Sequence, residues 1–204
     1  MNDEYKTILR ESESILKVEG SRFLARALPV DASAAAEKAL KGIRRRYHDA
    51  THHCFAYRTG TTGEEFRCSD DGEPSGTAGR PILFSIDKYE LTNILVVVTR
   101  YFGGTKLGTG GLARAYGAAS DQALKEAAIA TRYITEGLLV TLPHDQIGNV
   151  MRCISGAGIR IDDTTYDEDV HLRLEVRRSR IESLKEELAE ATAGNVRIVH
   201  PHPG

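Results

Sequence analysis

The chain has 204 residues, of which 41% are hydrophobic and 27% are charged, and its formal net charge is −2 at pH 7. These values are typical of a folded globular protein with one or two domains and a sizeable core, and they exclude a largely disordered chain. They also lack the strong basic excess that usually marks a nucleic-acid-binding domain.

Three features of the sequence bear on the cellular location: the cysteines, the apolar runs and the N-terminal segment. No apolar run reaches about 18 residues, so we expect no membrane helix. The opening MNDEYKTILRESES is acidic and polar and lacks the basic-then-apolar order of a signal peptide. Three scattered cysteines, Cys54, Cys68 and Cys153, are typical of reduced thiols. The sequence therefore predicts a cytoplasmic protein.

The first part of the chain has the pattern of a mixed α and β region. The expected strands are 7–18 and 22–30, joined near Glu19-Gly20, then 51–59 and 64–68, joined around Gly60–Gly63, and 93–102. The expected helices are about 32–46 with the apolar face Ala36, Leu40 and Ile43, a short helix from Ile82 to about Tyr89, and about 110–130. Asp31 is expected to cap the first helix. The segment NILVVVTRYF is continuously apolar at its centre, which indicates a strand covered on both faces.

The second part of the chain gives clearer periodicities. The expected strands are 136–143, 159–166, 170–176 and 195–200, with Val170, Leu172, Leu174 and Val176 on the buried face of the third. One helix follows Pro143 with the face Ile147, Val150, Met151 and Ile154, and Gly156 and Gly158 end it. A second helix begins with a Ser179–Glu182 capping box and is ended by Gly194. The order β-α-β-β-α-β is the ferredoxin-like arrangement. We expect two domains, 1–132 and 133–204.

Two glycine-dense loops stand directly before expected helices. The first, GTAGRP, contains Gly76 and Gly79 beside Arg80, and the second, GTGGLARAYGAA, begins at Gly108 and follows Lys106. The first amide groups of a helix lack internal partners and carry partial positive charge, so each loop is a candidate anion site. The alternative is that the glycines only permit tight turns and close packing.

The second loop also matches a nucleotide-binding fingerprint, but weakly. Gly108, Gly110 and Ala113 fit G-x-G-x-x-A after a strand. The glycines, however, come six or more residues after the strand end, and no acidic residue follows at the end of a second parallel strand. Neither loop contains the Walker sequence. We therefore assign no dinucleotide and no other cofactor.

The candidates for enzymatic chemistry are seven side chains: His52, His53, Cys54, Cys68, Asp70, Asp71 and Glu73. A Cys–His pair can supply a nucleophile and base, and a His–Cys–Asp cluster can hold zinc. Neighbours on a strand, such as His53 and Cys54, point to opposite faces. Acids in a glycine-proline loop usually form turns and caps. We assign no catalytic residue and no metal site.

Basic and aromatic residues next to these loops have two interpretations each. Arg44–Arg46 at a helix end complement the helix dipole, or contact phosphates. Tyr101 and Phe102 follow the apolar strand and stack on a nucleic-acid base, or close the core, and we expect one of the two in the core.

The motifs SDDGEPSGTAGRPIL, VVVTRYFGGTKLGTGGLARAYGAA and THHCFAY resemble the YigZ/IMPACT family over about residues 10–130. Residues 133–204 resemble the smaller C-terminal domain of the bacterial YigZ branch. The resemblance implies an α+β fold whose N-terminal domain is similar to the second domain of a small-subunit ribosomal protein. It also implies a ferredoxin-like C-terminal domain similar to the last domain of elongation factor G.

Eukaryotic IMPACT proteins are translational regulators, and the fold of bacterial members suggests nucleic-acid or ribosome binding. The resemblance and the loops together predict a non-enzymatic protein that binds RNA, the ribosome or a translation-associated partner, with no DNA specificity and no membrane. The residues expected at this site are His53, Glu73, Gly76, Thr77, Gly79, Arg80, Arg100, Tyr101, Gly103, Gly104, Lys106, Gly108, Gly110, Gly111 and Arg114.

Two alternatives stay open. The same loops can serve a small-molecule enzyme or sensor that binds a phosphorylated metabolite. Alternatively, the second domain is a protein-interaction module that uses the polar strand face His171, Arg173, Glu175 and Arg177.

Overall fold

The computed structural model describes residues 3–155 and 158–201. The chain divides into two compact α+β units: the first unit is Tyr5–Arg132, and the second unit is the chain from Tyr133 onward together with the residues up to Glu4. The mixed α+β class expected from the sequence is confirmed in both. In the described part of the chain, no helix has the length and apolar character needed to cross a membrane.

The first unit is built on a five-stranded sheet with the strand order β2-β3-β6-β4-β5, in which every neighbouring pair is antiparallel. Its strands are β2 (Ser12–Val18), β3 (Ser21–Pro29), β4 (His52–Thr59), β5 (Glu65–Ser69) and β6 (Ile94–Tyr101). The two expected hairpins, β2–β3 and β4–β5, are confirmed.

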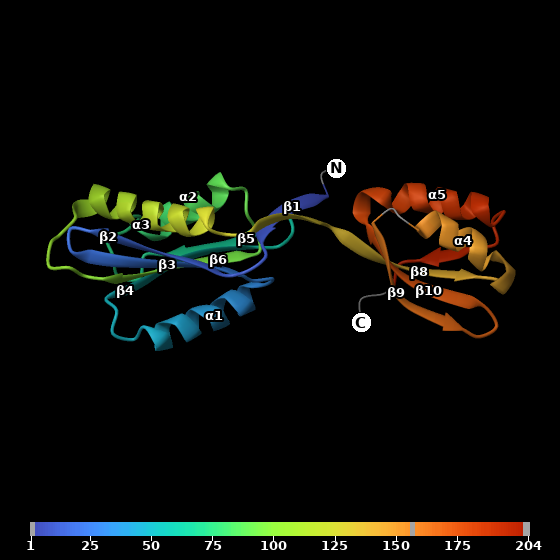
Figure 1. The fold of residues 1–204 in the computed structure, drawn as a ribbon, viewed down its shortest axis with the longest axis horizontal. Coiled ribbons are helices and arrows are strands. Elements are labelled where there is room, and N and C mark those ends of the chain that lie inside the picture. The colour runs from blue at the N-terminus through green and yellow to red at the C-terminus, as the bar shows by residue number, and fades with distance from the viewer. Residues whose placement is uncertain (1–2, 156–157, 202–204) are drawn as a thin grey trace. The chain divides into compact units, whose positions relative to one another are not determined.

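Helices cover both faces of this sheet. Figure 1 shows α2 (Gly79–Lys88) and α3 (Gly108–Lys125) on one face and α1 (Ser33–Arg46) on the other. Ala36, Leu40 and Ile43 of α1 are buried, as its periodicity predicted. The central strand β6 is buried over seven of its eight residues, so the expectation of a strand covered on both faces is confirmed. It is nevertheless antiparallel to its neighbours, because three layers bury an antiparallel strand as fully as a parallel one.

Some details of the first unit differ from the sequence-based expectation. Asp31 does not cap α1: the N-cap is Ala32, and no side chain bonds there. Helix α3 begins at Gly108 and ends at Lys125, five residues earlier than expected. A separate two-stranded sheet, β1 (Glu4–Ile8) with β7 (Ile129–Tyr133), was not predicted as such.

The second unit follows the expected order β-α-β-β-α-β. Its elements are β8 (Thr135–Leu142), η1 (His144–Gln146), α4 (Ile147–Ile154), β9 (Ile159–Tyr166), β10 (Val170–Arg177), η2 (Arg178–Arg180), α5 (Ile181–Ala191) and β11 (Arg197–Val199). The antiparallel sheet has the strand order β11-β8-β10-β9. Both helices pack on one face (Figure 1), and the alternating apolar residues of β10 are buried under them.

Two local features of the second unit depart from the expectation, and a third expectation is not tested. The Ser179–Glu182 capping box is absent, because a 3₁₀ turn precedes α5 and places Arg180 at the N-cap without a side-chain bond. Met151 is exposed. Gly156, expected to end α4, lies outside the described residues.

Asp3 belongs to the second unit although we expected residues 1–132 to form one domain. Its carboxylate accepts hydrogen bonds from the Arg177 guanidinium at 2.9 and 3.0 Å and from the Ser179 amide. The Arg177 bonds hold the pKa of Asp3 well below its usual range. A buried carboxylate of this kind needs its cation, which explains why the first described residue is fixed to this unit.

Within the first unit, the turn between β2 and β3 packs against the loop that follows β6. A Cβ added to Gly103 would overlap the carbonyl carbon of Gly20 and the amide nitrogen of Ser21. The amide of Gly103 donates to Ser21 Oγ at 3.1 Å. Only glycine fits at Gly103, because the atoms it would strike are backbone atoms that cannot rotate away.

We predict that Gly103→Ala destabilises the first unit by more than about 3 kcal/mol, the upper range for overpacking, because the backbone must separate to admit the methyl group. The matched variant is Gly42→Ala on α1, where a Cβ meets nothing within 4 Å. It should stabilise by about 0.5–1 kcal/mol through helix propensity. Urea unfolding measures both, and equal midpoints for Gly103→Ala and wild type would refute the close approach.

Candidate functional site

The loop between β5 and α2 begins with a tight turn over Asp70–Glu73. Asp71 and Gly72 have φ values of 45° and 89°, and the Glu73 amide donates to the Asp70 carbonyl oxygen at 3.0 Å. Two consecutive positive φ values are what a type I′ turn requires, and Asp-Gly is a favoured pair there. The acidic side chains of this turn bind three different elements: Asp70 binds α2, Asp71 binds β4 and Glu73 binds β6.

The carboxylate of Asp70 binds the start of α2. It accepts hydrogen bonds from the amides of Gly76 at 2.8 Å, Ala78 at 2.9 Å and Gly79 at 2.8 Å. Burial alone would raise the pKa of Asp70, but these three amides outweigh it and hold the pKa below its ordinary value. The first glycine loop therefore already holds an anion, which is the chain's own side chain, and its amides are not free for a ligand as we had expected.

The glycines of the first loop have structural explanations. Gly76 has a φ of 76°, and a Cβ at Gly79 would lie 2.7 Å from the Ser69 amide nitrogen. Thr77, another expected site residue, is buried and donates from its hydroxyl to the Pro74 carbonyl oxygen at 2.6 Å. For GTAGRP, then, tight turning and close packing account for the residues present.

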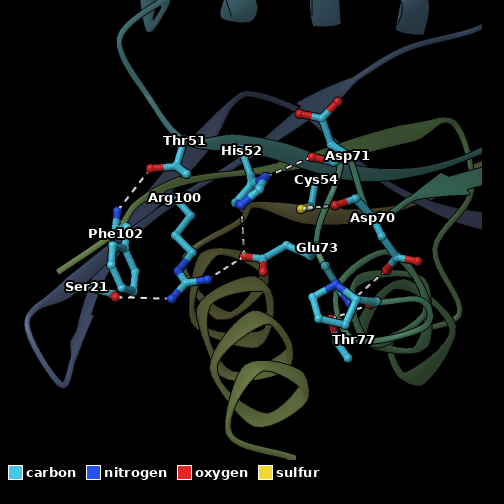
Figure 2. A network of polar contacts seen from close by, with 12 residues as sticks. Ser21, Thr51, His52, Cys54, Asp70, Asp71, Glu73, Thr77, Arg100 and Phe102 are labelled. Carbon is cyan, nitrogen blue, oxygen red and sulfur yellow. Dashed lines mark hydrogen bonds and ion pairs between the residues drawn. The ribbon is translucent and has the colours of Figure 1, made fainter. Parts of the chain in front are cut away.

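Glu73 forms a buried ion pair with Arg100 of β6 (Figure 2). The distance from Arg100 Nη1 to Glu73 Oε1 is 2.6 Å, and the two side chains are only 6% and 4% exposed. Tyr116 of α3 donates to the same oxygen at 2.7 Å, and Arg100 Nη2 donates to Ser21 Oγ at 3.3 Å. Arg100 was expected to contact a ligand phosphate from the surface, but it is an internal cation that joins the loop to the sheet.

Aromatic rings enclose the Arg100 guanidinium. Its Cζ lies 5.3 Å from the centre of the Phe23 ring and 5.5 Å from that of Phe102. Phe102 is 48% exposed, and its amide donates to Thr51 Oγ1 at 3.2 Å. Neither residue of the Tyr101–Phe102 pair is in the core, contrary to our expectation, because Tyr101 is half-buried and its hydroxyl donates to Asp49.

The side chains of His53 and Cys54, both on β4, are held by backbone carbonyl groups. His53, an expected site residue, is buried; its Nε2 lies 3.0 Å from the Tyr47 carbonyl oxygen, and its amide donates to Asp71 Oδ2 at 2.7 Å. Burial lowers the pKa of His53. Cys54 donates to the Asp70 carbonyl oxygen at 2.9 Å, and burial raises the pKa of its thiol to about 12. A thiol with this pKa is not a nucleophile at neutral pH.

The second glycine loop is different, because its backbone is open. Gly104 and Gly108 have φ values of 90° and 67°, and a Cβ at either would meet nothing within 4 Å. A Cβ at Gly110 would meet only the Arg114 side chain, at 3.4 Å. The N-cap of α3 is Leu107, and no side chain caps it. The start of α3 is therefore an exposed stretch of bare backbone.

Three exposed cations lie on or near this helix: Lys106 comes just before it, Arg114 lies in its second turn, and Arg80 of α2 lines a groove together with Arg114. None of them forms an ion pair with any residue that the structure describes. In contrast, the neighbouring Lys88 and Lys125 are both bound to Asp121 at 2.6 and 2.8 Å, and these bonds lower the pKa of Asp121 to about 2. Arg80 is close enough to Asp70 to help lower the pKa of that carboxylate, but no ion pair occupies any of the three cations, and all three can meet an external anion.

A groove of about 560 Å³ runs between α2 and α3 beside these cations. It is lined by Gly76, Arg80, Pro81, Phe84, Ser85, Lys88, Ala113, Arg114, Gly117 and Asp121. Phe84 is 71% exposed, and it was not among the site residues expected from the sequence. The signal was present, because the residue falls on the solvent side of α2 while Ile82 and Ile86 mark the buried side.

Several other candidates from the sequence have partners within the molecule. Arg44 bonds to Asp71 at 2.6 Å. On the polar face of β10, His171 bonds to Thr141 and Asp167, and Glu175 bonds to Thr135 and Arg160. Among residues 3–155 and 158–201, no three His, Cys, Asp or Glu side chains gather as a metal site would require.

Fold and site together define a two-unit antiparallel α+β protein whose first unit exposes a basic, glycine-rich helix start. Residues 19–124 match the family described as Impact N-terminal domain, and residues 140–195 match Domain of unknown function (DUF1949). The chain belongs to the IMPACT family.

Relatives of similar length support this membership. The chain is 31% identical to IMPACT family member YvyE of Bacillus subtilis (strain 168), over 95% of this chain and 89% of that protein. It is 29% identical to IMPACT family member YigZ of Escherichia coli (strain K12), over 90% and 91%. A solved structure titled "Crystal structure of an hypothetical protein" matches with a TM-score of 0.72 and 26% identity, and covers 100% of both chains.

We predict that Asp70→Asn costs about 2 kcal/mol at pH 7, because α2 loses a charged acceptor for three amides. The folded-state pKa of Asp70 is below the ordinary value of 3.8, so the ionised carboxylate stabilises the fold above that value. This stabilisation is lost as the pH falls through the folded-state pKa. The difference in unfolding free energy between wild type and Asp70→Asn should therefore shrink below about pH 4.

The control is Asp31→Asn, an exposed acid that the sequence suggested as a cap and that caps nothing. Its cost should stay within about 0.5 kcal/mol at every pH. A pH-independent difference for Asp70→Asn, or equal losses for the two variants, would contradict the assignment of Asp70 as the internal anion of α2.

Proposed function

We propose that the protein binds RNA of the translation machinery at the start of α3 and the adjoining α2–α3 groove, without catalysing a reaction. The observation that carries the proposal is the set of exposed cations Arg80, Lys106 and Arg114, which lack ion-pair partners in the described chain and line the helix start and the adjoining groove. Phosphate contacts by Lys, Arg and helix N-termini supply most of the affinity of a protein for nucleic acid.

The groove adds a contact for a base. Phe84 exposes most of its ring between Arg80 and Lys88 in the lining of the groove. Aromatic rings beside basic residues bind single-stranded nucleic acid by stacking, which adds about 1–3 kcal/mol per base. The combination favours a single-stranded segment over a duplex, whose bases are already stacked on one another.

Family resemblance supports the translation context. Eukaryotic IMPACT proteins are translational regulators, and the family resemblance implies a first unit similar to the second domain of a small-subunit ribosomal protein. It also implies a second unit similar to the last domain of elongation factor G. This support is an analogy between folds, and the site itself carries the argument for RNA. A cytoplasmic location and a ribosome-associated partner are parts of the same proposal.

The expected site residues take two different roles in this proposal. Arg80, Lys106 and Arg114 bind phosphate, together with the exposed backbone of Gly108 and Gly110, whereas Gly111 is half-buried against Leu107. Glu73, Arg100 and the first glycine loop position the start of α3, because Glu73 joins β6 to Tyr116 of α3. His53 belongs to the positioning group through its amide bond to Asp71.

We predict that replacing Arg80, Lys106 and Arg114 together by alanine weakens RNA binding and flattens its salt dependence. Each lost phosphate contact to a single strand removes about 0.7 from the slope of log affinity against log salt, so the triple variant should lose about 2. Fluorescence anisotropy with a labelled single-stranded RNA, titrated at several salt concentrations, measures the slope.

The matched control replaces Lys38, Lys41 and Arg45 by alanine. These exposed residues lie on α1, which covers the opposite face of the sheet (Figure 1), and the change in charge is identical. The control should keep the wild-type slope. Equal slopes for the two triple variants would show that only net charge matters, and no RNA binding by wild type at about 50 mM salt would end the proposal.

We also predict that Gly110→Ala separates stability from binding. The methyl group fits beside Arg114, and helix propensity should stabilise α3 by about 0.5 kcal/mol. The same methyl group covers the helix-start amides, so RNA affinity should fall several-fold. Gly42→Ala gains the same propensity on α1 and should bind as wild type. Undiminished affinity of Gly110→Ala would show that RNA does not approach this backbone.

A further inference from the structure

A cavity of about 250 Å³ lies next to the start of α3, on the side of the buried ion pair. Its lining residues are Glu73, Pro74, Arg100, Phe102, Lys106, Leu107, Gly108, Thr109 and Leu112. It does not contain Arg80 or Arg114, which line the α2–α3 groove, so a ligand bound in this cavity would be distinct from one bound in the groove.

Arg100 in the wall of this cavity has an unused hydrogen-bond donor. Its side chain is only 6% exposed, and its two terminal nitrogens bond to Glu73 and Ser21. The third nitrogen, Nε, is buried and has no hydrogen-bond partner in the structure. A buried donor without an acceptor is unfavourable, and a small shift of the Arg100 side chain toward the cavity would let a ligand oxygen remove that penalty.

The charge of the cavity fits a phosphate monoester. Glu73 neutralises Arg100, which leaves Lys106 and the partial charge of the α3 start, together about 1.5 positive charges. A phosphate monoester carries about 1.5 to 2 negative charges at pH 7. An internal phosphodiester carries only one, so a chain-end phosphate matches the cavity better than a phosphate within a strand.

The size and the aromatic wall fit one nucleotide. The volume of about 250 Å³ is below the usual range for ligand pockets, so the cavity holds a small group such as one nucleotide. Phe102 is about half exposed at the cavity, where its ring can stack on a base.

We propose that this cavity binds a nucleotide through its phosphate monoester, with the phosphate at Gly108 and Thr109 beside Lys106 and Arg100, and the base on Phe102. The ligand is a free nucleoside monophosphate or the 5′-phosphorylated end of an RNA. The RNA source deepens the proposed function and rests on it, whereas the free nucleotide does not.

The test uses the full chain and a single-stranded RNA of about ten nucleotides with a 3′ label, prepared with a 5′-phosphate or a 5′-hydroxyl. The phosphorylated RNA should bind at least about tenfold more tightly, which corresponds to about 1.4 kcal/mol. Nucleoside monophosphates should compete with it, and the corresponding nucleosides should not.

Two variants locate the effect. Lys106→Ala should remove most of the preference for the 5′-phosphate, and Phe102→Ala should weaken both the phosphorylated RNA and the monophosphate. The matched controls are Lys41→Ala on α1 and Phe66→Ala on β5, a residue that is 57% exposed and does not line the cavity. Both controls should keep the wild-type preference.

The outcomes separate this inference from the proposed function. Equal binding of the two RNAs without competition by monophosphates overturns the inference and leaves RNA binding intact. Monophosphate binding without RNA binding supports the cavity and overturns the RNA proposal. Binding of neither ligand overturns both.

Discussion

The buried ion pair between Glu73 and Arg100 is the interaction on which the arrangement of the site depends. One carboxylate oxygen receives hydrogen bonds from Arg100 of β6 and Tyr116 of α3. Three segments far apart in the sequence therefore meet at Glu73, and removing one partner of such a buried pair costs about 3–5 kcal/mol. The pair is structural, yet it decides where the start of α3 lies and what stands beside it.

The two glycine-rich loops look alike in the sequence and have opposite roles in the molecule. At the first, Asp70 occupies the helix-start amides, and the neighbouring glycines serve turns and close packing. At the second, no side chain caps the helix, and the space around Gly108 and Gly110 is largely open. Electrostatics makes both helix starts attractive to an anion, but only the second is left for a ligand. The exposed cations Lys106 and Arg114 gather at that second loop.

The sequence predicted the parts of the structure that follow from local pattern. The period of the apolar residues identifies β10 as a half-buried strand and α1 as a helix with one buried face. The continuous apolar centre of β6 identifies a strand buried on both faces. The sequence did not predict which acid would meet which amide. Asp31 and Ser179 had the right residue type for a cap, yet Asp70, which lies outside α2, is the residue that binds a helix start. Arg100 was misread for the same reason, since its partner Glu73 lies 27 residues away and only the fold brings them together.

The contact between Ser21 and Gly103 has a consequence for the order in which the first unit folds during synthesis. The hydrogen bond between them spans 82 residues, and the loop it anchors leads directly into α3. Closing so long a stretch of chain is slow compared with forming a helix or a hairpin. The β2–β3 hairpin therefore cannot make its contact with Gly103 until β6 and the loop after it have emerged from the ribosome. Nascent chains that end before Gly103 contain the hairpin and α1 but cannot present the open helix start.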